Sequence, residues 1–113
     1  MLQIDRNETD GVTVLRLQGR LVLGDESQRL SQQIEQLMSQ QTAKILVNIE
    51  SVTFIDSCGV GELIASFTKV RKSGGTLKVS SPRDQVLEVL QVVRFPVVVE
   101  VHATEQEALA SFA

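Results

Sequence analysis

Residues 44–49, KILVNI, form the segment that most restricts what this chain can fold into. The run is almost continuously apolar, but it is too short for a helix that would cross a core. Such a run is typical of a parallel strand that is covered on both faces, because a strand with one exposed face alternates polar and apolar residues. The sequence therefore predicts a layered α/β protein built around a central strand at this position.

Strand-like and helix-like runs alternate along the rest of the chain. Two short strands, LQID and VTVLRL, flank the pair Asp10-Gly11, which is typical of a tight hairpin. Further strands are predicted at TLKVS, residues 76–80, and at VVVEV, residues 97–101. The resulting order ββαβαβαβα favours a mixed, mostly parallel sheet of about five strands with an N-terminal hairpin and about four helices.

Helices are predicted where apolar residues recur at intervals of three and four. The first begins at Asp25, which suits a capping box, and the second follows Asp56 and stops at KSGG, residues 72–75. For the third helix, Ser81 is the expected N-cap, with a proline directly after it. Thr104 is expected to start a short terminal helix.

Length and composition exclude several classes of function. The 113 residues suit one domain, so we expect a single domain over residues 1–113. A net charge of -3 argues against direct binding to nucleic acid, which needs clustered cations. No run has the length of a membrane span and no leader is evident, so we expect a cytoplasmic protein without membrane contact. One cysteine and one histidine cannot build a zinc site, and neither metal nor cofactor is expected.

The stretch FIDSCGVGEL, residues 54–63, carries the side chains best suited to a function. Ser57 follows Asp56 at the start of a predicted helix, beside unpaired backbone N–H groups and the positive end of the helix dipole. Gly59 and Gly61 leave that turn bare, so the backbone of another protein or a phosphate can approach closely. We therefore expect Ser57 to be presented on the surface.

No enzyme mechanism is predicted for this stretch. Cys58 lacks the base or cationic neighbour that forms a thiolate, and Ile64 stands where a phosphatase loop would need arginine. We expect Cys58 to be a small, semi-buried packing residue. The chain also has no nucleotide-binding or kinase signature, so a phosphoryl group on Ser57 would come from another protein.

Four segments, in order and at matching spacing, resemble the STAS domain family: LRLQGRLVLGDES, ILVNIESVTFIDSCGVGEL, RKSGGTLKV and TEQEAL. The family includes bacterial anti-sigma factor antagonists and the cytoplasmic domains of sulfate transporters. The resemblance implies a STAS-like fold, an ATP-dependent anti-sigma factor kinase that phosphorylates Ser57, and a PP2C-type phosphatase that removes the phosphate. It also implies a partner-binding segment made of Asp56, Ser57, Cys58, Gly59, Val60 and Gly61.

Three functions stay open at this point. The first is a phosphorylation-switched antagonist that binds an anti-sigma kinase and frees a sigma factor. The second is an unphosphorylated STAS adaptor of a lipid-transport ATPase or a signalling scaffold. The third is an enzyme that uses Cys58 or Ser57, which the absence of a base disfavours. Ser57 also has a purely structural alternative as a helix N-cap, and Asp56 has one as a turn former.

Overall fold

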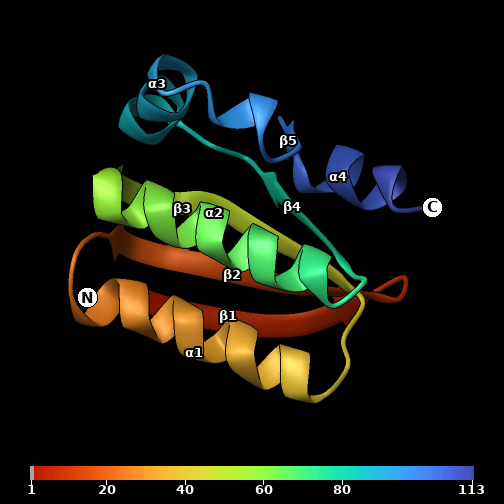
Figure 1. Cartoon of the computed structure of the whole chain (residues 1–113). Helices are drawn as coiled ribbons and strands as arrows, with labels where there is room; N and C mark the ends of the chain where they lie inside the picture. The colour runs from red at the N-terminus through yellow and green to blue at the C-terminus, as the bar shows by residue number, and fades with distance from the viewer. Residues whose placement is uncertain (1) are drawn as a thin grey trace.

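The computed structural model describes residues 2–113, and within them a five-stranded sheet has the order β1-β2-β3-β4-β5 (Figure 1). β1 and β2 form an antiparallel hairpin, and every other neighbouring pair is parallel. This arrangement confirms the predicted mixed sheet. The strands are β1 (Leu2–Thr9), β2 (Val12–Leu21), β3 (Lys44–Ile55), β4 (Thr76–Ser80) and β5 (Val101–His102).

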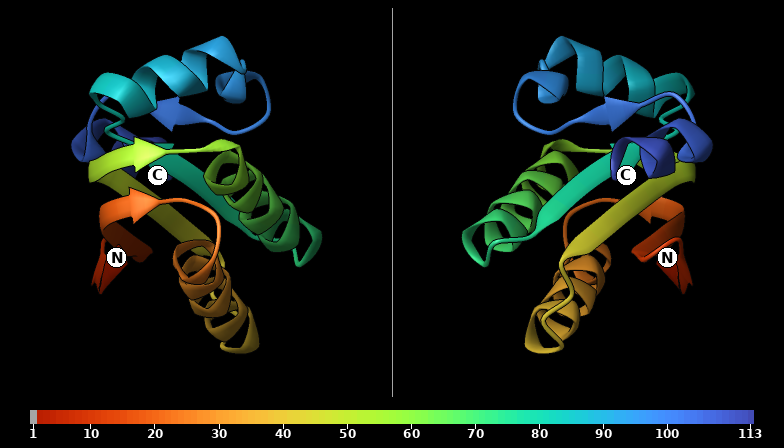
Figure 2. Two further views of the ribbon diagram at one scale, coloured as in Figure 1. Left: turned by 90° about the vertical axis from the view of Figure 1, so that its left-hand side faces the viewer. Right: turned by 90° about the vertical axis from the view of Figure 1, so that its right-hand side faces the viewer.

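Two layers of helix enclose the sheet. α1 and α2 lie side by side over one face, whereas α4 lies on the opposite face (Figure 2). The larger part of the core forms beneath α1 and α2, where Leu30, Ile34 and Leu63 are buried. The α-helices in the described residues are α1 (Asp25–Ser39), α2 (Ser57–Lys72), α3 (Asp84–Val92) and α4 (Glu105–Ser111).

β3 lies in the middle of the sheet, as its sequence predicted. Residues 45–49 are all buried, with Ile45 and Val47 in the core beneath α1 and α2 and Leu46 in the smaller cluster beneath α4. Both faces of this strand are therefore covered. β3 then continues six residues beyond the predicted run, to Ile55.

The predicted helix starts are only partly right. α1 begins at Asp25 as expected, but Gly24 is its N-cap and no side chain caps it. Ser81 is not the N-cap of α3, which begins at Asp84. The backbone of Ser81 is left-handed, with φ of 67°, whereas an N-cap residue is normally extended, and its N–H donates to the carbonyl of His102 at 2.9 Å.

The predicted strand at VVVEV, residues 97–101, is largely wrong. Only Val101 and His102 pair with β4, and Phe95–Val97 forms a short 3-10 helix, η1. The backbone N–H of Val99 donates to the carbonyl of Phe95, and both of these side chains are buried. A spacing of four residues buries one side of a helical turn, so β-branched composition alone misidentified this segment.

The start of α2 lies against the end of β2 with no room for a side chain. A Cβ atom added to Gly59 would lie 2.2 Å from the carbonyl oxygen of Leu21, far inside van der Waals contact. A Cβ atom on Gly61 would meet nothing within 4 Å. Of the two glycines, only Gly59 is required for close backbone approach.

We expect Gly59→Ala to lower the free energy of unfolding by about 1–3 kcal/mol, because the methyl group forces α2 away from β2. Gly61→Ala is the matched control at an exposed position of the same helix and should raise stability by up to about 1 kcal/mol. Urea denaturation of both variants measures these changes. Equal stability of Gly59→Ala and wild type would contradict the close approach.

Candidate functional site

Ser57 lies at the carboxyl edge of the sheet, where β3 ends and α2 begins. It is the first residue of α2 and is exposed to solvent. Within residues 2–113, no group forms a hydrogen bond with its hydroxyl. The hydroxyl is therefore free to meet a group from another molecule.

Asp56 shapes the turn that carries Ser57. Its Oδ1 accepts a hydrogen bond from the backbone N–H of Gly59 at 2.8 Å, which caps α2. Its Oδ2 accepts from the N–H of Leu23 at 3.0 Å, which fastens the loop between β2 and α1. Asp56 is thus the N-cap, and the structural alternative that assigned the cap to Ser57 is wrong.

The Asp56 carboxylate places a negative charge beside Ser57. Burial alone would raise the pKa of Asp56, but hydrogen bonds from the backbone N–H groups of Gly59, Leu23 and Cys58 outweigh it and hold the pKa below its usual value. The carboxyl group is therefore ionised at neutral pH.

The last residues of β3 are held on both sides of the strand. The N–H of Asp56 donates to the carbonyl of Leu21 in β2 at 3.4 Å. On the other side, the amide of Gln85 from α3 donates to the carbonyl of Ile55 at 3.1 Å and accepts from its N–H at 3.1 Å. No sequence pattern marks Gln85, because its partner is a backbone group 30 residues away.

The six residues predicted to bind a partner differ in exposure. The exposed ones are Ser57, Cys58 and Gly61, Asp56 is half-buried, and Gly59 and Val60 are buried. The expectation that Cys58 is semi-buried is wrong, since this thiol faces solvent. A partner that meets the turn from outside would therefore touch the exposed side chains, while Gly59 and Val60 hold the turn from within.

Exposed apolar side chains border the turn. Leu23 is 72% exposed, and its backbone is bonded to Asp56. Phe54 is 39% exposed, and the Arg20 guanidinium lies 5.3 Å from its ring centre. Apolar side chains around an unpaired hydroxyl suit contact with a protein.

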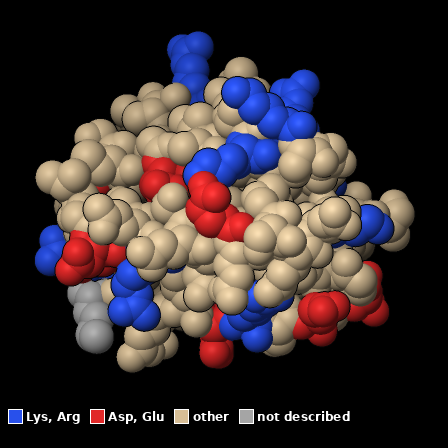
Figure 3. Space-filling model, turned by 60° about the horizontal axis from the view of Figure 1, so that its bottom comes forward, with Lys and Arg blue, Asp and Glu red and all other residues tan. Residues whose placement is uncertain are grey.

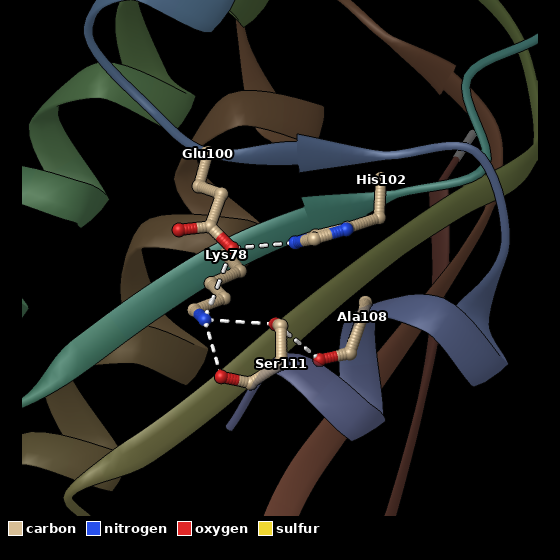
Figure 4. Close-up of polar contacts among 5 residues, drawn as sticks. All are labelled: Lys78, Glu100, His102, Ala108 and Ser111. Atoms are coloured by element: carbon tan, nitrogen blue, oxygen red, sulfur yellow. Dashed lines mark hydrogen bonds and ion pairs between the residues drawn. The ribbon is translucent and has the colours of Figure 1, made fainter. Parts of the chain in front are cut away.

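The remaining polar clusters serve the structure. Lys78 in β4 donates to the backbone carbonyl of Ser111 at 3.0 Å and pairs with Glu100, which also bonds His102 (Figure 4). These contacts tie α4 and β5 to the sheet. His102 belongs to this cluster, and in residues 2–113 no three His, Cys, Asp or Glu side chains are grouped to hold a metal ion.

The surface charges are mixed in sign. Lys69 near the end of α2 pairs with Glu35 of α1, and on the face shown in Figure 3 basic and acidic side chains are intermixed. Among the described residues, no helix combines the length and the apolar character needed to cross a bilayer.

We expect Asp56→Ala to lower the free energy of unfolding by about 0.5–2 kcal/mol at pH 7, because the N-cap is lost. Asp56→Asn, which keeps an acceptor for Gly59, should lose less. Since folding lowers the pKa of Asp56, the charged carboxylate stabilises the fold above the ordinary aspartate pKa of about 4, and this contribution disappears as the pH falls through the folded-state pKa. In urea unfolding, the free energies of unfolding of wild type and Asp56→Asn should therefore converge as the pH is lowered. A difference that stays constant with pH would contradict the lowered pKa of Asp56.

Comparison with known proteins agrees with this architecture. The family model described as STAS domain matches residues 3–108. An anti-sigma F factor antagonist from Paenibacillus polymyxa is 24% identical over 108 residues, which cover 96% of this chain and 92% of that protein.

Solved structures show the same fold. An anti-sigma-factor antagonist (STAS) domain protein from Planctomyces limnophilus has a TM-score of 0.81 at 26% identity, with 96% of each chain covered. SpoIIAA from Bacillus, solved in its phosphorylated form, has a TM-score of 0.72 at 24% identity, with all of both chains covered. Because the family model spans nearly the whole sequence, the chain belongs to the STAS domain family.

Proposed function

We propose that this protein is a phosphorylation-switched anti-sigma factor antagonist of the bacterial cytoplasm. In the unmodified form it binds an anti-sigma factor that is also a serine kinase, and the sigma factor is released. Phosphorylation of Ser57 by that kinase ends the binding, and a PP2C-type phosphatase restores it.

One observation carries the proposal: the exposed Ser57 hydroxyl at the first turn of α2, with no hydrogen-bond partner in residues 2–113. A serine that only capped the helix would accept a hydrogen bond from a backbone N–H with its hydroxyl oxygen, but Asp56 already fills that role. The hydroxyl is thus available to a kinase without any rearrangement of the helix start.

The names of similar proteins support the same role. The relative from Paenibacillus polymyxa is named as an anti-sigma F factor antagonist, and SpoIIAA has been solved in both unphosphorylated and phosphorylated forms. The fold of this chain therefore suits a protein that carries a phosphate without unfolding.

The chemistry of phosphoryl transfer belongs to the partner. Transfer to a serine needs bound Mg-ATP and a base near the hydroxyl. This chain has no nucleotide-binding signature, and its single histidine lies in the Lys78 cluster instead of beside Ser57. The protein is thus a substrate and a binding partner, with the enzyme supplied in trans.

A phosphate changes the surface of the turn more than its fold. It adds about -1.5 to -2 charges at pH 7 next to the ionised Asp56, at a helix N-terminus that tolerates anions. A partner that closes over a neutral hydroxyl must then desolvate an unmatched dianion, which costs several kcal/mol. At about 1.4 kcal/mol per factor of ten, the affinity falls by about two orders of magnitude or more.

We expect Ser57→Ala to bind the kinase equally well with and without Mg-ATP, because it cannot be charged. Ser57→Asp should fold but bind about 100-fold more weakly. Calorimetric titration against the candidate kinase measures both affinities. Ser51→Asp is the matched control, since it adds the same charge to an exposed serine of β3 outside the turn.

Equal binding by wild type, Ser57→Ala and Ser57→Asp, together with no phosphate transfer to wild type, would refute the switch. The unphosphorylated adaptor would then be the better description of this protein.

The exposed thiol of Cys58 provides a second test. We expect Cys58→Ala to change the free energy of unfolding by no more than about 0.5 kcal/mol and to be phosphorylated like wild type, because the thiol neither packs in the core nor takes part in transfer. In wild type, the kinase should slow the reaction of Cys58 with a maleimide reagent, because it covers the turn. Unchanged labelling in a saturated complex would place the interface elsewhere.

A further inference from the structure

β3 extends well past the strand beside it. β4 pairs with β3 only as far as Asn48 and Ser80, whereas β3 continues to Ile55. On its other side, β2 accompanies β3 to the pair Leu21 and Ile55. The part of β3 that leads into Ser57 therefore has a strand neighbour on one side only.

The side chain of Gln85 takes the place of the missing strand at Ile55. One planar amide donates to the carbonyl of Ile55 and accepts from its N–H, each at 3.1 Å, which is the pair of bonds that a neighbouring strand offers. The N–H of Asp56 points to the opposite side, toward Leu21. Hydrogen bonds to β2 on one side and to α3 on the other thus hold the end of β3 in place.

Core packing fixes the position of α3, which carries this amide. Val86, next to Gln85, and Leu90, one turn further on, are both buried in the main core. The position of the Gln85 backbone is therefore set by core packing. A shift of α3 would be passed to Ile55, and through Asp56 to the turn that carries Ser57.

We propose that Gln85 is a positioning residue for Ser57, and that α3 controls through it how the turn is presented to a partner. The inference rests on the proposed function, since it assigns a second element to the regulation of the same site. Gln85 does not touch the reacting hydroxyl. It acts through the backbone of Ile55.

Amide hydrogen exchange followed by NMR tests the contact itself. In wild type, we expect the Ile55 N–H to be protected although no strand pairs with it on that side. Gln85→Met, which keeps the side-chain length without polar atoms, should exchange at Ile55 about tenfold faster, as expected for the loss of a hydrogen bond. Gln85→Glu keeps the acceptor but loses the donor, and it should shift the Ser57 and Cys58 amide resonances. Gln91→Met and Gln91→Glu make the same changes at an exposed glutamine of α3 whose side chain forms no hydrogen bond within residues 2–113. These two variants should change neither the exchange at Ile55 nor the resonances of Ser57 and Cys58.

Phosphorylation by the candidate kinase tests the consequence. We expect kcat/KM for Ser57 to fall about tenfold in both Gln85 variants, mainly through KM, because the turn is presented less well while the chemistry of the kinase is unchanged. The Gln91 variants should match wild type. A general loss of stability would not produce this split between KM and kcat at temperatures well below the melting transition.

Two results would overturn the inference. One is an Ile55 amide that exchanges in wild type as fast as an unstructured amide. The other is faster exchange in the Gln85 variants with phosphorylation equal to that of the Gln91 variants. If the kinase does not phosphorylate wild type, the proposed function fails, and the exchange and resonance changes still decide whether Gln85 positions the turn.

Discussion

The carbonyl oxygen of Leu21 is the point on which the geometry of the site depends. It accepts the N–H of Asp56 at the end of β3, and Gly59 in the first turn of α2 lies so close that no side chain fits between them. These two contacts bring a strand end and a helix start onto the end of β2. Because α2 is seated this deeply, its first residue, Ser57, projects outward from the edge of the sheet.

Several side-chain hydrogen bonds hold the turn around Ser57 in place. Asp56 caps α2 and holds the loop before α1, while the amide of Gln85 holds the peptide groups of Ile55. A rigid turn lowers the entropic cost of partner binding, because the bound conformation already exists. Under the proposed function, a change of charge at Ser57 would alter recognition without requiring a new backbone conformation.

The sequence was most informative where the physics is local. The central strand at residues 44–49 and the Asp10-Gly11 hairpin were predicted because periodicity and turn chemistry act over a few residues. The exposure of Cys58 was not predicted, since it depends on which side of α2 meets the sheet. No sequence pattern marked Gln85, because its side chain bonds the backbone of Ile55, a residue far away in the sequence. The strand prediction for residues 97–101 was wrong because β-branched residues also occupy helical turns where tertiary packing favours them.

The parts that meet at the turn come from widely separated stretches of the chain: Leu21 from β2, Asp56 after β3, and Gln85 from α3. The arrangement cannot exist in a nascent chain that lacks α3, nor in a molecule whose hairpin has detached from the sheet. A kinase that reads the shape of the turn, and not a short linear motif, would therefore ignore incomplete or unfolded copies. Under the proposed function, signalling through this turn would report the number of correctly assembled molecules, as distinct from the number synthesised.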